Sequence, residues 1–559
     1  MKSSTQVCLV AILLFGNIVG AEDSDPAEIV NGERLFLETR FAEFFYQHLQ
    51  NGGKVNSELP QGDPALNSTV KFQGQHAEQA SMLDGPFAGQ SMNCRSCHLV
   101  DEHLDDAKFG MRSYSDFARR SILPAREDGK TLTVRNSPPL VGVSVEREHF
   151  MLHFDGEFSS MMELVLNTLT GRNLGWLPEE KHKAMHHICR VIKHDNGTDS
   201  LAEEFGNLSY KEMLSGVTNE EKSVEDEFLL PVEYRLDVAE ANCSQIVEGV
   251  AKLIAIYTDD LMFGQDSEGA FELSPYDQFL IVNNLPRQPS ENANDFEYSQ
   301  NLLNAISELE KNNKIKFIHH DLSTKEESFQ FHNQRFVFAE SELAGLKVFF
   351  SIGENNSGGN GNCVACHVPP NFSDFSLHNT GVTQHEYDRV HGLGAFSKLM
   401  IPTLSERNAH PEKYLPATLQ HPANAEVFRS IPSKDNHQLT DLGAWNILAN
   451  EDYPYAQTSL VNALCQSSLN CKFDDELLAK SIATFKTPSV RDLGHSSPFM
   501  HNGQFNDLEQ VVDFYLQISV LAKNGMLRNA DIEILKMNLS EKDISPLAAF
   551  MRSLNEDYN

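Results

Sequence analysis

The sequence has few basic residues, no long apolar stretch after its first twenty residues, and little strand-like alternation. Lysine and arginine total 45 against 79 acidic residues, so the formal charge is −34 over 559 residues. Such an acidic surface repels phosphate, which argues against nucleic acid and favours a basic protein partner. Because apolar and polar residues do not alternate, we expect a mainly helical fold. Hydrophobic residues make up 40% of the chain, enough for the cores of two or three domains.

The first residues predict an export signal. Met1-Lys2 gives a positive start, residues 7–19 are mostly apolar, and Val19-Gly20-Ala21 offers small side chains for cleavage. The apolar core is too short for a comfortable membrane span, and after cleavage the chain would have no membrane span. The alternative is that the segment is not cleaved and serves as a membrane anchor. We therefore expect an exported, periplasmic protein whose residues 1–21 are a signal peptide.

Two groups of cysteines carry the strongest signal. The pattern Cys-x-x-Cys-His occurs at residues 94–98 and again at residues 363–367. This pattern is the attachment motif of c-type haem. Each thiol adds to one vinyl group of the porphyrin, and the histidine is then held beneath the iron as its proximal ligand. The sequence therefore predicts two covalently bound c-type haems, held by Cys94, Cys97 and His98, and by Cys363, Cys366 and His367.

Two other uses of paired cysteines fit this sequence less well than haem attachment. A zinc site also uses paired cysteines, but its pairs usually lie about 15 to 20 residues apart, whereas these lie in opposite halves of the chain. A redox dithiol would leave both histidines unexplained. The remaining cysteines of the exported chain suit disulfides in an oxidising compartment. Cys465 and Cys471 are close enough in sequence to pair, which leaves Cys189 with Cys243.

The parts of the sequence recur in the same order. A helix-like stretch precedes each haem motif, at residues 31–36 and 340–350, and proline turns and a glycine loop follow each motif. This repetition predicts two c-type-cytochrome-like haem domains with short helices, long loops and an inserted region between the motifs. We expect the N-terminal haem domain with its insertion to span residues 22–335, and the C-terminal haem domain to span residues 336–559.

Several segments resemble the di-haem cytochrome c peroxidases and their MauG-type relatives. The best matches are the second haem motif with residues 371–381, and the C-terminal segments 485–491, 497–503 and 508–515. The resemblance implies a haem-dependent oxidoreductase, either a peroxidase or a peroxide-dependent oxidase. Hydrogen peroxide would react at the N-terminal, peroxidatic haem, and electrons would pass through the C-terminal, electron-transfer haem. The electron donor would be a small molecule or a protein, such as a basic cytochrome or a cupredoxin.

The resemblance also implies a sixth ligand for the second iron, which is methionine in the peroxidases and tyrosine in the MauG-type enzymes. Counting along the family signature from His501, this position falls at Tyr515. Asn506 and Glu509 can cap the helix that would carry Tyr515 on one face with Leu508. A tyrosinate ligand stabilises ferric iron and so favours the MauG-like branch. The alternative is that Tyr515 is only a core residue of that face.

A calcium ion between the haems is a further implication of the resemblance. The matching positions are Asn136, through its side chain, and Ser496 and Pro498, through their carbonyls. These are the hard oxygen donors that calcium prefers. Asn136 equally suits a turn before Ser137-Pro138.

The sequence departs from the family pattern near the first haem. Phe154 stands where the family has a tryptophan between the haems, and Leu174 stands where it has a distal glutamate. The acid–base catalyst of peroxide cleavage is therefore unknown, and Glu157 and His153, which flank the Asp-Gly motif, are the candidates. Two other functions stay open: a di-haem oxygenase acting on an organic substrate, and a non-enzymatic electron-transfer cytochrome.

Overall fold

The structure is a computed structural model and is mainly helical, as the sequence predicts. It describes residues 25–66, 89–98, 120–145, 147, 150–219, 223–290, 294–319, 335–352, 359–465 and 472–556. The predicted signal peptide thus lies outside the described residues. Within the described ranges, no helix is both long enough and apolar enough to cross a membrane.

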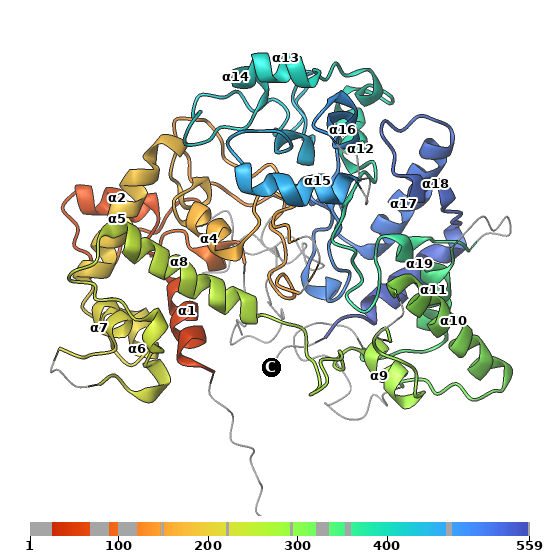
Figure 1. Ribbon diagram of the computed structural model, residues 1–559, viewed down its shortest axis with the longest axis horizontal. Helices are drawn as coiled ribbons and strands as arrows, with labels where there is room; N and C mark the ends of the chain where they lie inside the picture. The colour runs from red at the N-terminus through yellow and green to blue at the C-terminus, as the bar shows by residue number, and fades with distance from the viewer. Residues whose placement is uncertain are drawn as a thin grey trace, which may run out of the picture.

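The helices fall into groups that follow the chain (Figure 1). One group, on the left of the figure, comprises α1 (Ala27–Leu37), α2 (Glu43–Gln50), α4 (Met161–Leu169), α5 (Lys181–His194), α6 (Ser200–Glu204), α7 (Tyr210–Ser215) and α8 (Cys243–Asp260). A second group, on the right, comprises α9 (Pro275–Val282), α10 (Asp295–Lys311), α11 (Glu340–Phe350), α17 (Leu508–Lys523), α18 (Ile532–Lys536) and α19 (Glu541–Arg552). Above them lie α12 (Val382–His391), α13 (Leu404–Ala409), α14 (Pro411–Tyr414), α15 (Gln457–Cys465) and α16 (Asp475–Lys480). The short strands β1 (Leu377–His378) and β2 (Phe485–Lys486) pair antiparallel.

Each half of the chain contains two helices that cross at a glycine. Helix α1 packs against α8, and α11 packs against α19. A Cβ atom on Gly32 of α1 would lie 2.4 Å from the carbonyl oxygen of Leu253, and one on Gly345 of α11 would lie 1.9 Å from that of Pro546. No side chain fits at such distances, so only glycine allows these helix backbones to touch.

The buried hydrophobic residues form clusters that correspond to these groups. The first cluster joins α1, α2, α4, α5 and α8. The second joins α9, α10 and α11 with α17 and α19, so α9 and α10 pack with the C-terminal half although they precede the second haem motif. A third cluster surrounds Trp445 among α12, α15 and α16. The domain division at residue 335 stays a prediction.

The disulfides agree with the cysteine pattern where the structure describes them. Cys189 of α5 is bonded to Cys243 at the start of α8, which confirms the predicted pair. Cys465 is also disulfide-bonded, whereas its predicted partner Cys471 lies outside the described residues.

Buried charges hold the turn between α1 and α2. The Arg40 guanidinium donates to both oxygens of Glu38, at 2.8 and 2.6 Å, and to Asp195 at 2.9 Å. The Tyr210 hydroxyl donates to the same Glu38 carboxylate at 2.6 Å. Burial raises the pKa of Glu38, but the charge of Arg40 together with the hydrogen bonds from Arg40 and Tyr210 lowers it to about 2. This pair fixes the chain just after α1.

We expect Glu38→Gln to lower the free energy of unfolding by about 3 kcal/mol at pH 7, because Arg40 loses its charged partner in a buried site. The pKa of Glu38 falls from 4.5 to about 2 on folding. Its contribution is therefore complete above pH 4.5 and is lost as the pH falls towards 2. Urea denaturation should show the difference from the parent shrinking by about half between pH 7 and pH 3. The exposed Glu412→Gln is the control, and an equal deficit at both pH values would contradict the assignment.

Candidate functional site

The first Cys-x-x-Cys-His segment forms a tight turn beside the end of α1. Cys94–Ser96 is a 3-10 helix, and the amide of His98 donates to the carbonyl of Cys94 at 2.9 Å. The side chain of Asn93 caps this turn and donates to the carbonyl of Leu37, the last residue of α1, at 2.7 Å. The turn is thereby attached to the helix that crosses α8.

The second segment forms the same turn beside the end of α11. Cys363–Ala365 is again a 3-10 helix, and the amide of His367 donates to the carbonyl of Cys363 at 2.8 Å. The chain is attached to α11 by the amide of Gly361, which donates to the carbonyl of Val348 at 2.9 Å. The two predicted haem segments thus share one local geometry and one position relative to a glycine-crossed helix.

The side chains of both turns fit a covalently attached haem. All four thiols are free and half-buried, and burial raises the pKa of Cys94 and of Cys363 to about 12. Burial also lowers the pKa of His98, to about 4, and that of His367. Both imidazoles are therefore neutral at pH 7, the form that binds a metal.

The two imidazoles differ in what surrounds them. Nδ1 of His367 lies 3.1 Å from the carbonyl oxygen of Phe372, which orients the ring and leaves Nε2 for a metal. Nδ1 of His98 is buried and has no hydrogen-bond partner in the described part of the chain. The residues that follow it, 99–119, lie outside the described ranges.

Tyr515 lies beside the second pair of thiols. Burial raises the pKa of its phenol, and the thiols of Cys366 and Cys363 raise it further, so the ring is close to both sulfur atoms. Tyr515 is half-buried and packs with Phe514, whereas Leu508, which the sequence places on the same face, belongs to the second core cluster. Conversion of the thiols to thioethers would remove their repulsion of a phenolate.

The cap of α17 differs from the prediction. Asp507, not Asn506, is the N-cap, and its side chain accepts a hydrogen bond from the amide of Gln510 at 2.8 Å. Glu509 instead pairs with Arg552 at 2.8 and 2.6 Å. Both Asn and Asp are good capping residues. Which of two neighbouring residues caps the helix depends on which one has the extended backbone that precedes the first helical turn.

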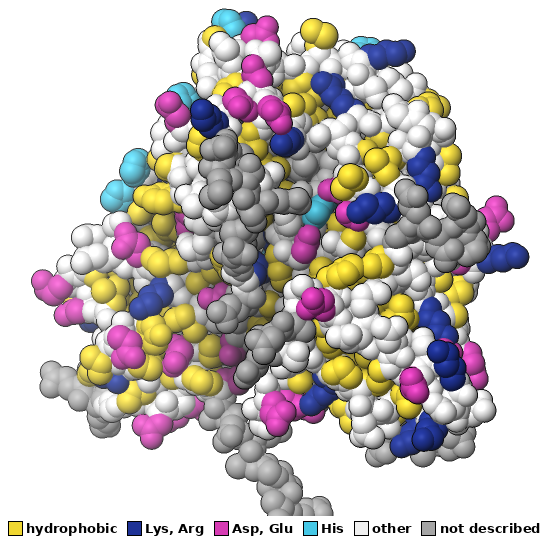
Figure 2. Space-filling view, turned by 45° about the vertical axis from the view of Figure 1, so that its right-hand side comes forward, with side chains coloured by type: hydrophobic (Ala, Val, Ile, Leu, Met, Phe, Trp, Pro, Cys, Tyr) yellow, Lys and Arg dark blue, Asp and Glu magenta, His cyan; other side chains and the backbone are white. Residues whose placement is uncertain are grey.

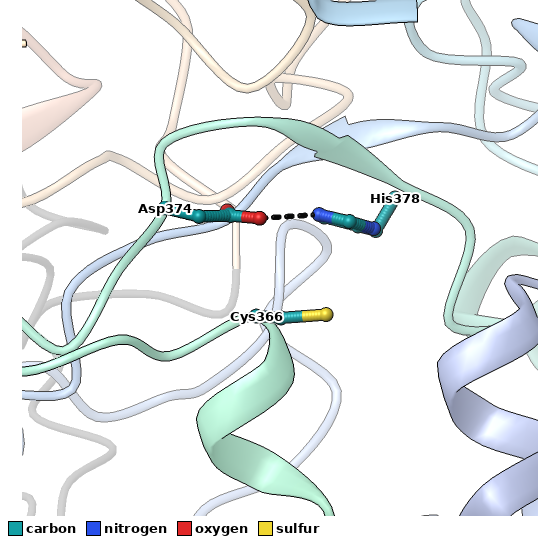
Figure 3. Close-up of side chains that lie close together, drawn as sticks. All are labelled: Cys366, Asp374 and His378. Carbon is teal, nitrogen blue, oxygen red and sulfur yellow. Dashed lines mark hydrogen bonds and ion pairs between the residues drawn. The ribbon is translucent and has the colours of Figure 1, made fainter. Parts of the chain in front are cut away.

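A buried charged histidine lies beside the second pair of thiols. The Cys366 sulfur, an Asp374 carboxylate oxygen and a ring nitrogen of His378 lie within 4.8 Å of one another (Figure 3). His378 bonds Asp374 through Nε2 at 2.7 Å and Asp531 through Nδ1 at 2.6 Å. Burial opposes protonation, but the two carboxylates raise the pKa of His378 far above its ordinary value. With both nitrogens protonated the ring has no lone pair for a metal, so this group is a charge network at the edge of the haem turn.

The two candidate acid–base residues lie together in a tight loop. Leu152 pairs with Phe158 across the loop, and His153 has a left-handed backbone with φ of 59°. Nδ1 of His153 lies 2.9 Å from Glu157, and Arg429 donates to the same carboxylate at 2.5 Å. Burial would raise the pKa of Glu157, but the charge of Arg429 holds it well below its ordinary value. Glu157 therefore stays ionised and orients His153 instead of donating a proton.

This loop lies near the first haem segment and is joined to the other half of the chain. Burial lowers the pKa of His98, and the charge of His153 lowers it further. The two imidazoles therefore lie near each other. Asp155 is fully buried and lies 2.6 Å from Arg135. The same guanidinium donates to both oxygens of Asp441, at 2.6 and 2.9 Å. The sequence does not reveal this network, because its members are far apart in the chain.

Phe154 lies where the two halves meet. Its ring packs edge-on against His501 with centroids 6.5 Å apart, and His501 stacks on Phe485 at 3.6 Å. Trp176 and Trp445 are fully buried in the first and third core clusters. The aromatic contact between the halves is therefore made by phenylalanine and histidine.

The residues predicted to bind calcium lie on neighbouring segments. The amide of Asn136 donates to the carbonyl of Pro498, and its oxygen accepts from the backbone of Ser137 at 3.1 Å. The Ser496 hydroxyl donates to the carbonyl of Asp492 at 3.4 Å. Protein groups thus satisfy the Asn136 amide in this arrangement, and calcium binding stays a prediction.

Sequence relatives of this chain are known, although no protein-family model matches it. It is 27% identical to the cytochrome-c peroxidase IdrP2 of Denitromonas iodatirespirans over 197 residues, which are 35% of this chain and 37% of the relative. It is 38% identical to the methylamine utilization protein MauG of Methylorubrum extorquens over 74 residues, which are 13% of this chain and 19% of MauG. The chain therefore spans well under half the length of the curated relatives it matches.

Two solved structures have a partly similar arrangement. The diheme peroxidase BthA of Burkholderia thailandensis is 15% identical, with a TM-score of 0.44 over 95% of this chain and 86% of BthA. A MauG-like protein associated with microbial copper homeostasis is 14% identical, with a TM-score of 0.41 over 96% of this chain and 91% of that protein. Scores this low support no further comparison. The sequence relatives confirm the resemblance: over part of its length, the chain is similar to cytochrome-c peroxidases and to MauG.

Proposed function

We propose that the protein is a periplasmic di-haem oxidoreductase that reduces hydrogen peroxide at the N-terminal haem and passes electrons through the C-terminal haem. One observation carries the proposal: two turns of the same geometry each present two free thiols and a neutral, buried imidazole. The relationship to cytochrome-c peroxidases and MauG supports it. The four cysteines would hold the haems by thioether bonds, with His98 and His367 as proximal ligands.

The surroundings of the two histidines support different tasks. His367 is oriented by the carbonyl of Phe372, and Tyr515 approaches the same cysteines. The second iron would then have two protein ligands and serve as an electron store. We assign the peroxide reaction to the side of His98, where His153 is the nearby titratable side chain. Bound haem would supply the electrons for peroxide reduction.

Peroxide reduction also needs a group that moves a proton from one oxygen to the other. We assign this task to His153, whose Nδ1 is held by Glu157 and whose Nε2 can take up and return a proton. Glu157 stays ionised because Arg429 binds it, so it fixes the tautomer of His153. Leu174, at the position of the family's distal glutamate, is buried in the first core cluster and offers no acid.

The formal charge of −34 favours a basic electron donor, such as a cytochrome or a cupredoxin. On the face shown in Figure 2, acidic side chains are scattered among hydrophobic and basic ones and do not gather over one element. The overall charge would therefore steer a donor without marking one docking site there, and a small-molecule donor is the alternative. A calcium ion at Asn136, Ser496 and Pro498 would link the two halves.

The reaction at His98 is tested with hydrogen peroxide. We expect the intact mass to exceed the mature polypeptide by two haems, and peroxide to withdraw two electrons from the ferric protein. His98→Gln should abolish this reaction and leave the spectrum of the other haem intact, because the proximal ligand of one iron alone is lost. Stopped-flow absorbance measures the rate, with the exposed His194→Gln as control. A mass with fewer than two haems, or a His98 variant as fast as the parent, would contradict the proposal, and oxygen-bound iron without peroxide turnover would favour the oxygenase.

Proton transfer by His153 is tested with His153→Asn, since asparagine tolerates the left-handed backbone at this position. We expect the peroxide reaction to slow by about 10²- to 10⁴-fold, with two haems still attached. Glu157→Gln should slow it less and shift its pH profile, because the tautomer of His153 is no longer fixed. An unchanged rate in His153→Asn would remove this residue from the mechanism.

Ligation by Tyr515 is tested with Tyr515→Phe, which keeps the volume of the ring. We expect the low-spin ferric signal in electron paramagnetic resonance to convert to high spin or to a new ligand set. The reduction potential should rise because an anionic ligand is lost, and Tyr515→Met should raise it further. Tyr387→Phe is the control, because it removes a different phenol, which donates to the carbonyl of His437. It should lower the free energy of unfolding by about 1 kcal/mol and leave both haem spectra unchanged. An unchanged low-spin signal in Tyr515→Phe would mean that Tyr515 is only a core residue.

A further inference from the structure

Two cationic side chains meet between the halves of the chain, and no described carboxylate forms an ion pair with either. Nζ of Lys486 donates to the carbonyl of Met151 at 3.1 Å, and Nη2 of Arg147 donates to the same carbonyl at 3.2 Å. Nη1 of Arg147 donates to the carbonyl of Val143 at 2.9 Å, while its Nε is buried and has no partner among the residues that the structure describes. Both side chains are half-buried, and among the described residues no acidic group affects the pKa of either.

This arrangement is electrostatically unfavourable as it stands. Burial and the charge of Arg147 lower the pKa of Lys486 to about 7, and burial lowers that of Arg147 to about 10. Some other buried cations of this acidic chain have carboxylate partners, as Arg491 has in Asp277 at 2.9 Å. A carboxylate between the two cations would raise both pKa values again and remove this penalty.

A buried guanidinium alone would not require an anion here. Arg407 is fully buried and binds three carbonyl groups within residues 445–449 without any carboxylate. Burial alone lowers its pKa, to about 10, with no second cation contributing. What distinguishes Arg147 is the presence of Lys486 on the same carbonyl group.

The two cations lie next to the second haem segment. The Arg147 guanidinium lies over the ring of Phe375, 4.5 Å from its centre, and Lys486 stands opposite Leu377 in the two-stranded sheet. Phe375 and Leu377 both belong to the segment that follows the Cys366 turn. The amide of Asp374, just before Phe375, donates to the Cys366 carbonyl at 2.8 Å and so holds this segment against the turn. A haem attached to that turn carries two propionate carboxylates, one for each cation.

We propose that Arg147 and Lys486 bind the propionates of the haem attached at Cys363 and Cys366. This inference rests on the haem attachment proposed above. Ionised propionates supply the missing negative charge, and a guanidinium binds a carboxylate through two parallel hydrogen bonds, for which Nε of Arg147 is free. Arg147 comes from the N-terminal half of the chain, so it would hold the haem of the C-terminal half from across the contact. Both are positioning residues that also set the charge around the iron.

The reduction potentials of the two-haem protein test this contact. Lys486→Met and Arg147→Met should each lower the potential of the C-terminal haem, because loss of a cation favours the ferric state. We expect about a tenfold change in the one-electron equilibrium constant, which is about 59 mV. Lys486→Arg should keep the parent value. Arg407→Met is the matched control, because it removes a buried guanidinium that binds the carbonyls of residues 445–449 and is not assigned to a haem; it should lower stability and leave both potentials unchanged. Spectroelectrochemical titration, with paramagnetic resonance to assign each haem, gives these values.

The outcomes separate this inference from the proposed function. A mass without haem would refute the attachment itself, whereas two attached haems with unchanged potentials in both methionine variants would refute only the propionate contact. A shift confined to the N-terminal haem would also overturn it, as would a parent potential that responds to added acetate, since the site would then take free anions. If Lys486→Met does not fold, Arg147→Lys and Arg147→Gln provide the same comparison, with the lysine variant expected to keep the parent potential and the glutamine variant to lower it.

Discussion

Both candidate sites depend on the contact of two helix backbones at a glycine. Gly32 lets α1 touch α8, and Gly345 lets α11 touch α19. A helix is stiff along its length, so fixing its middle also fixes its C-terminal end, where each Cys-x-x-Cys-His turn is hydrogen-bonded. A larger side chain at either glycine would separate the helices and displace a turn whose two thiols must reach two vinyl groups of one porphyrin. The same construction, used twice, explains why the two turns are alike.

Charged side chains, more than apolar ones, fix how the two halves meet at the sites. Arg135 binds Asp155 on its own side and Asp441 on the other, and Arg429 of the C-terminal half binds Glu157 of the N-terminal half. A buried carboxylate without its partner is strongly unfavourable, so these contacts allow few alternative arrangements. They place the loop of residues 152–158 beside the first haem turn. The ion pairs that join the halves therefore also position His153 near His98.

The sequence predicts the parts of the site whose chemistry is local. The haem turns follow from the covalent spacing of cysteine and histidine, and the helices that lead into them follow from local pattern. The charged networks do not, because Asp531 lies 153 residues from His378 and Arg429 lies 272 residues from Glu157, and no periodicity connects such positions. The cap of α17 lies between these cases: a capping residue was expected, but the backbone places Asp507 at the N-cap, one residue later than the prediction.

One motif can give two different sites because the groups that surround each imidazole come from elsewhere in the fold. The backbone turn is the same at His98 and at His367. Within the part of the chain that the structure describes, only the second site has a carbonyl on Nδ1, a phenol beside the thiols and a histidinium bound between two carboxylates. These groups hold the ring still and limit access, which suits an iron that stores electrons and does not bind substrate. The first site has an imidazole nitrogen without a described partner and a second histidine nearby, so the difference in reactivity would arise from tertiary contacts and not from the motif.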